Sequence, residues 1–147
     1  MSKLDSKLKE LIITFRKLRD PMSGCPWDKE QDFKSIASSA IEESYEVADA
    51  IERENFEDLK AELGDLLFQI VFHSEMAREE NLFTLEDIVD ELNSKLIRRH
   101  PHIFDDGNAK DAKDSLRIWE DIKAKERSDK NLNSLMDDVP KNLPSLT

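Results

Sequence analysis

The sequence predicts a single all-α domain followed by a short tail. Gly and Pro occur only 3 and 5 times in 147 residues, and so few turn-forming residues favour a handful of long helices over many short strands. Apolar residues recur at helical spacing, and no segment alternates apolar and polar residues over the length of a strand. A chain of this length can bury a core of its own.

Local signals set the limits of the predicted helices. Asp20-Pro21 ends the first one, because the residue before a proline disfavours helix. Asn55 is expected to cap the third helix, and Thr84, with Asp87 three residues later, to cap the fourth. The five predicted helices cover residues 6–19, 33–53, 56–80, 85–100 and 111–127.

The segments between these helices are predicted to be loops. Residues 20–29 contain two prolines and a glycine, and residues 101–110 contain Gly107 after an initial proline. Residues 128–147 hold Pro140 and no sustained hydrophobic period. The expected organisation is therefore a domain at residues 1–127 and a tail, resembling an interdomain linker, at residues 128–147.

Composition restricts the function classes. A formal net charge of −11 argues against binding nucleic acid or an acidic membrane through a general electrostatic field. No apolar run approaches the roughly 20 residues that cross a bilayer, and residues 1–9 lack a signal-peptide core. Cys25 is the only cysteine, so an intrachain disulfide is excluded. We expect a cytoplasmic protein.

Two pairs of acids lie where apolar residues are expected. With each residue placed about 100° from the last, Glu43 lies within the predicted core-facing arc of helix 33–53, and Glu46 lies one turn further along its edge. On helix 56–80, Glu62 and Asp65 flank the apolar arc. The members of this arc are Leu59, Leu63, Leu66, Leu67, Ile70, Val71 and Ala77.

These acid pairs allow two interpretations. If the two helices are antiparallel neighbours, their four carboxylates converge, and such charges repel unless a cation lies among them. Oxygen ligands select hard cations, which predicts Mg²⁺ with Mn²⁺ as a substitute. Alternatively, the acids are solvated helix surface, as most acids are. Gly64, which lies between Glu62 and Asp65, costs about 1 kcal/mol in a helix and suggests close approach of a backbone or ligand.

A basic cluster lies near the end of the fourth predicted helix. Lys95 and Arg99 share a face because they are four residues apart, and Arg98 lies beside them. These cations either complement the negative end of the helix dipole or clamp phosphates.

The aromatic residues leave a similar choice. Trp27 and Trp119 could cover a nucleotide base or anchor their segments to the bundle. His73 is expected to be a packed core residue, and Cys25 a structural one.

Together these motifs resemble the MazG family of nucleoside triphosphate pyrophosphohydrolases. The resemblance covers residues 8–127. Its matching pieces are Cys25-Pro26-Trp27-Asp28, Glu42-Glu43-Ser44-Tyr45-Glu46, Glu62-Leu63-Gly64-Asp65-Leu66-Leu67, Lys95-Leu96-Ile97-Arg98-Arg99-His100-Pro101-His102 and Trp119-Glu120-Asp121-Ile122-Lys123.

The resemblance implies an all-α bundle with a four-helix core, formed as a homodimer. It also implies Mg²⁺-dependent hydrolysis of a nucleoside triphosphate to the monophosphate and pyrophosphate, by attack of water on the α-phosphate. The metal ligands carried over by position are Glu43, Glu46, Glu62 and Asp65. The expected catalytic residues are Glu42, Glu43 and Lys95, and the expected substrate-binding residues are Lys95, Arg98, Arg99, Trp119 and Lys123.

Two other functions are compatible with the same residues. Members of the family often carry two such domains, whereas this sequence has one, so a helical dimer with a weak site and a regulatory or protein-binding role is the alternative. A narrower substrate, such as a phosphoribosyl-ATP or a single pyrimidine deoxynucleotide, is the other, because related enzymes use the same metal motif.

Overall fold

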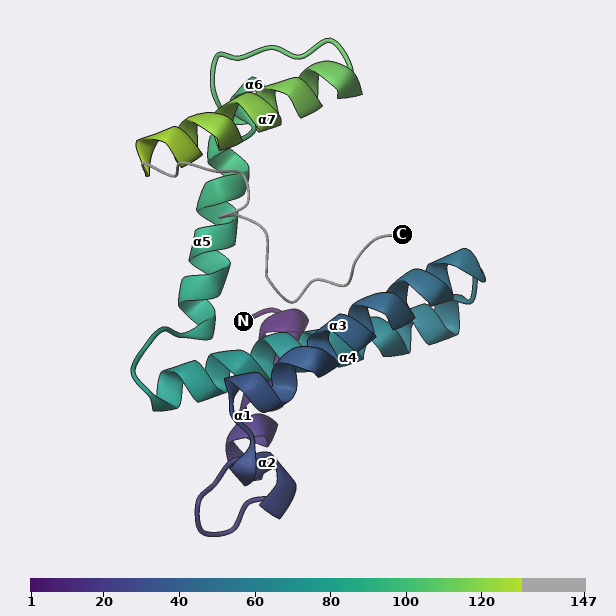
Figure 1. Ribbon diagram of the computed structural model, residues 1–147, viewed down its shortest axis with the longest axis vertical. Coiled ribbons are helices and arrows are strands. Elements are labelled where there is room, and N and C mark those ends of the chain that lie inside the picture. The colour runs from purple at the N-terminus through teal and green to yellow at the C-terminus, as the bar shows by residue number, and fades with distance from the viewer. Residues whose placement is uncertain (131–147) are drawn as a thin grey trace. The chain divides into compact units, whose positions relative to one another are not determined.

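Helices make up the regular structure of the computed structural model, which describes residues 1–130 (Figure 1). The helices are α1 (Lys3–Leu18), α2 (Pro26–Glu30), α3 (Phe33–Glu52), α4 (Phe56–Glu79), α5 (Leu85–Arg98), α6 (Pro101–Phe104) and α7 (Ala112–Asp129). The described residues contain no strand, which confirms the predicted all-α class. None of their helices is long and apolar enough to cross a membrane.

The chain divides into two compact units, one from Met1 to Val89 and one from Asp90 onward. In the first unit, α3 and α4 pack along each other as an antiparallel hairpin, and α1 packs on α4 (Figure 1). The short α3–α4 connection places Glu54 at φ 54°, in the left-handed region that non-glycine residues adopt in tight turns.

Aromatic residues form the core of the first unit. Phe15 of α1 contacts Phe68 and Phe72 of α4, with ring centroids 5.2 and 6.0 Å apart. Ile36 of α3 and Met76 of α4 complete the buried cluster with them. This cluster fixes α1 and α3 on the same stretch of α4, because close-packed aromatic side chains tolerate little displacement.

Most predicted helix limits are confirmed. Asn55 accepts a hydrogen bond from the backbone N–H of Asp58, and Thr84 and Asp87 form a capping box. The first helix begins at Lys3 rather than at residue 6, because Ser2 and Asp5 form a second capping box that the sequence reading missed.

The two predicted loops are wrong in part. Each contains a short helix, α2 and α6, and each of these begins at a proline, Pro26 or Pro101. The fixed φ of proline suits the first helical position, so the residue that argued for a loop in fact starts a helix. The C-terminal helix ends at Asp129, two residues later than predicted. Residues 131–147 of the predicted tail lie outside the described part of the chain.

The predicted apolar arc of α4 is only partly buried. Val71 and Ala77 are fully buried, whereas Leu63, Leu67 and Ile70 remain 48%, 41% and 43% exposed. The first unit therefore presents apolar side chains that its own helices do not cover. The predicted four-helix core and homodimer stay predictions.

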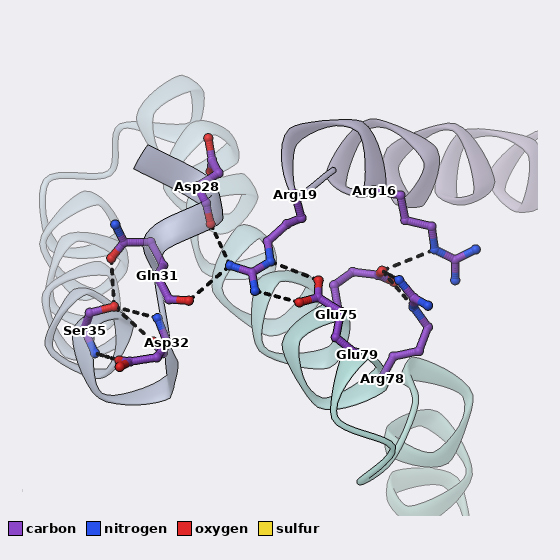
Figure 2. A network of polar contacts seen from close by, with 9 residues as sticks. All are labelled: Arg16, Arg19, Asp28, Gln31, Asp32, Ser35, Glu75, Arg78 and Glu79. Carbon is purple, nitrogen blue, oxygen red and sulfur yellow. Dashed lines mark hydrogen bonds and ion pairs between the residues drawn. The ribbon is translucent and has the colours of Figure 1, made fainter. Parts of the chain in front are cut away.

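A polar network fixes the segment between α1 and α3 (Figure 2). Arg19 donates through Nη1 to the carbonyl oxygens of Asp28 and Gln31, at 2.6 and 3.1 Å. Its Nε and Nη2 donate to the two carboxylate oxygens of Glu79 on α4, at 3.0 and 2.7 Å. One guanidinium therefore links the end of α1, the α2 segment and the end of α4, in a geometry that lysine cannot reproduce.

Beside this network, Glu75 of α4 is the shared partner of two other arginines. Its Oε2 accepts from Nε of Arg16 at 3.2 Å and from Nε of Arg78 at 3.0 Å (Figure 2). The Glu75 side chain is only 4% exposed, and a buried carboxylate needs such partners to stay charged.

We expect Arg19→Gln to lower the free energy of unfolding by about 2 kcal/mol or more, because it leaves the Glu79 carboxylate and two carbonyls without their donor. Urea denaturation followed by circular dichroism measures the change. Arg53→Gln is the matched control. Its ion pairs with Asp49 and Asp58 are exposed, so its cost should stay below about 1 kcal/mol. Equal effects of the two substitutions would contradict the anchoring role of Arg19.

Candidate functional site

Three of the predicted acids converge where α3 and α4 pack together. Glu43 comes from α3, and Glu62 and Asp65 come from the first half of α4. One carboxylate oxygen of each lies within 4.8 Å of the corresponding oxygen of the other two. The i, i+3 spacing places Glu62 and Asp65 on adjoining positions of one helix face, and the hairpin brings Glu43 against them.

The electrostatic environment of Glu43 is unusual for a carboxylate. Its Oε2 is buried, and no hydrogen-bond donor of the described residues reaches it. Burial raises the pKa of Glu43 to about 7, with further contributions from a hydrogen bond to Glu62 and from the negative charges of Asp65, Glu62 and Glu46. Near neutral pH, Glu43 is therefore protonated to a far greater extent than an exposed glutamate.

These residues fit a divalent cation. The cluster offers only carboxylate oxygens, which hard cations such as Mg²⁺ and Mn²⁺ prefer. A cation would provide what the orphaned Glu43 oxygen lacks, namely a positive partner in a half-buried position.

The other two predicted acids lie outside this convergence. Glu46 is exposed on α3, and it is not among the three residues whose oxygens meet, although its charge contributes to the raised pKa of Glu43. Glu42 is exposed as well. The structure thus brings together three of the four predicted ligands, and the roles of Glu46 and Glu42 stay predictions.

Gly64 has open space beside it. A Cβ atom built at this position would meet nothing within 4 Å. No backbone of the described chain approaches it, contrary to one of the two expectations from sequence. The remaining expectation is that a ligand, or another chain, uses the room beside the carboxylates.

The basic cluster near the end of α5 is organised by an acid that the sequence reading missed. Glu126 of α7 accepts hydrogen bonds from Arg98 and from Arg99, at 2.5 and 2.7 Å. These two hydrogen bonds hold the pKa of Glu126 at about 2, well below its ordinary value. Lys95 is half-buried and forms no ion pair with the described residues.

Trp119 lies in the same cluster. The guanidinium carbon of Arg99 is 4.8 Å from the centroid of its ring, and the ring of His100 meets it edge-on at 5.3 Å. Glu126 follows Trp119 by seven residues, which is about two helical turns, so the two residues share a helix face. This spacing is the sequence signal that could have identified Glu126. Lys123, one turn after Trp119 on α7, is half-buried.

The remaining sequence candidates have structural contacts. Trp27 makes an edge contact with the buried Phe72, with ring centroids 6.5 Å apart, and this contact favours anchoring of its segment, while about half of the Trp27 side chain remains exposed. His73 stacks parallel to Phe33 at 5.8 Å, and burial lowers its pKa, as expected for a packed histidine.

The helices and the carboxylate cluster define an all-α protein with a candidate divalent-cation site. A family model described as the MazG nucleotide pyrophosphohydrolase domain matches residues 31–104, about half of the chain. This range includes α3, α4 and α5, and hence every carboxylate of the cluster and the basic residues of α5. The chain belongs to the MazG family.

Full-length relatives agree with this assignment. A nucleoside triphosphate pyrophosphohydrolase of Escherichia coli K12 is 50% identical over 141 residues, which are 96% of this chain and 54% of that protein. The nucleoside triphosphate pyrophosphohydrolase/pyrophosphatase MazG of Thermotoga maritima is 44% identical over 138 residues, 94% of this chain and 52% of that protein. The chain thus spans about half the length of these curated relatives.

A solved structure shares the fold. The crystal structure of a mazG-related protein from Thermotoga maritima aligns with a TM-score of 0.63 and 24% identity, over 81% of this chain and 98% of that chain.

In the metal-free protein, Glu43 should make stability depend on pH. Its pKa is about 7 when folded, against 4.5 ordinarily, so the folded state keeps a proton that the unfolded state releases. The free energy of unfolding should therefore fall as pH rises from about 4.5 to 7. Glu43→Gln should flatten this slope in thermal melts with EDTA, and Glu42→Gln should not. An unchanged slope in Glu43→Gln would contradict the raised pKa of Glu43.

Gly64→Ala should raise the free energy of unfolding by about 1 kcal/mol, because it adds helix propensity without a clash in the chain. Gly24→Ala is the opposing control, since its Cβ would clash with the carbonyl oxygens of Leu18 and Asp20. Urea melts of both variants, at a concentration where the chain is monomeric, measure the changes. A loss of stability in Gly64→Ala would show that another group occupies the space beside Gly64 and would contradict this prediction.

Proposed function

We propose that this chain hydrolyses nucleoside triphosphates to the monophosphate and pyrophosphate with Mg²⁺. The observation that carries the proposal is the convergence of Glu43, Glu62 and Asp65, in which the buried Oε2 of Glu43 has no donor in the described part of the chain. Membership of the MazG family and the similarity to the nucleoside triphosphate pyrophosphohydrolases of Escherichia coli and Thermotoga maritima support the same chemistry.

The acids are proposed to hold the metal. Glu43, Glu62 and Asp65 supply the converging oxygens, and Glu46, one turn from Glu43, is the proposed fourth ligand. A bound Mg²⁺ would offset charge on the phosphates and lower the pKa of the attacking water. Glu42 is proposed to accept the proton of that water, because its exposed carboxylate has no partner among the described residues.

The cations are proposed to bind the triphosphate. In a chain with a net charge of −11, a polyanion needs local positive charge. Among residues 1–130, Lys95 provides an ammonium without an ion-pair partner, and Arg98 and Arg99 both pair with the carboxylate of Glu126. Trp119 and Lys123 are proposed to contact the nucleoside.

In the proposed reaction, the water attacks the α-phosphorus. The bond between this phosphorus and the oxygen that bridges it to the β-phosphorus breaks, and pyrophosphate leaves.

A homodimer is proposed as the working form. Its support is the row of partly exposed apolar residues on α4, Leu63, Leu67 and Ile70, which the helices of the first unit leave uncovered. Apolar surface of this kind marks association sites in soluble proteins.

The test is chromatography of the products from each ribo- and deoxynucleoside triphosphate, with Mg²⁺ or with EDTA. We expect monophosphate and pyrophosphate with Mg²⁺ alone, and Mn²⁺ should replace it. Asp65→Asn should lower kcat by about 100-fold or more, in line with losing one pre-positioned charge in other active sites. Glu57→Gln, on the same helix with an exposed pair to Lys60, should leave kcat unchanged.

No turnover of any nucleotide would overturn the proposal and favour the regulatory helical dimer. Turnover of one substrate alone would favour the narrower enzyme. Near-normal turnover by Asp65→Asn would remove that residue from the site.

A further inference from the structure

Glu126 occupies a central position among the cations of the second unit. Its Oε1 accepts from Nε of Arg98, and its Oε2 accepts from Nη2 of Arg99. Each arginine thus has its own carboxylate oxygen, and the Glu126 side chain is only 21% exposed. Charge-assisted hydrogen bonds in a partly buried position are stronger and more directional than those at an open surface.

Arg99 is held by two contacts of different kinds. One edge of its guanidinium meets Glu126, and one face lies over the ring of Trp119 at 4.8 Å. Its side chain is 11% exposed. Its Nε is buried and makes no hydrogen bond with the described residues, so one donor of this guanidinium remains unused. An unused buried donor costs stability unless a ligand or water meets it.

The charge of the cluster remains positive after these contacts. Glu126 and Glu91, whose charge also acts on Arg98, supply two negative charges. Arg98, Arg99 and Lys95, which lies on the same face of the helix end, supply three positive charges. Glu126 therefore orients the arginines without neutralising them, and an anion can still be attracted.

We propose that Glu126 is a positioning residue that presents Arg98 and Arg99 to the triphosphate of the substrate. This inference rests on the proposed function, because it assigns a role within substrate binding. It differs from a merely structural role, in which Glu126 only ties α7 to the end of α5. A structural tie would alter stability but leave the affinity of folded protein for the substrate unchanged.

The test uses the full chain and compares Glu126→Gln with wild type. The amide keeps the shape of the side chain and removes its charge. We expect KM for the best nucleotide to rise about tenfold, the equivalent of one charge-assisted hydrogen bond, with kcat within about twofold of wild type because the carboxylate cluster is untouched. Calorimetric titration with pyrophosphate, in EDTA, should show a matching loss of affinity.

Glu126→Asp keeps the charge on a shorter side chain. We expect its KM to lie between those of wild type and Glu126→Gln, and this partial rescue also carries the test if the glutamine variant does not fold. Asp121→Asn is the matched control on α7. Its pair with Arg117, 3.5 Å long and exposed, should affect neither KM nor pyrophosphate binding.

The outcomes separate this inference from the function on which it rests. If wild type turns over nucleotide and Glu126→Gln has an unchanged KM with lower stability, the tie is structural and the inference is wrong. If wild type neither turns over nucleotide nor binds pyrophosphate, the proposed function itself fails.

Discussion

Repulsion among the carboxylates at the α3–α4 contact is the constraint on which the candidate metal centre depends. Packing of the hairpin buries Glu43 against Glu62 and Asp65, and this burial, with the added effect of the neighbouring carboxylates, raises the pKa of Glu43 to about 7. A proton relieves this repulsion in the protein by itself, and a divalent cation would relieve it more fully. The hairpin thus stores an unfavourable interaction that a ligand can remove, as is common at functional sites.

Such an arrangement persists only if the rest of the unit holds the two helices in place. The aromatic cluster of Phe15, Phe68 and Phe72 fixes α1 on α4, and Ile36 joins α3 to the same core. Arg19 then ties the chain before α3 to the end of α4 (Figure 2). Apolar burial supplies most of the stabilisation, and the directional hydrogen bonds fix the register.

In the second unit, positively charged rather than negatively charged side chains lie close together. Arg98 and Arg99 would repel each other if they were unpaired, and Glu126 holds both while leaving the cluster with net positive charge. Trp119 adds a contact with the face of Arg99 that does not consume its hydrogen-bond donors.

The sequence by itself determined the helical class, most helix limits and the acids of the cluster, because these depend on periodicity and capping within one segment. It misjudged Pro26 and Pro101, since a proline can end one helix or start another and only the neighbouring backbone decides which. It could not show that Glu46 lies apart from the other three acids, or that Glu126 joins Arg98 and Arg99. Both depend on how side chains of different helices meet, and that is decided by tertiary packing rather than by the spacing of residues along the chain.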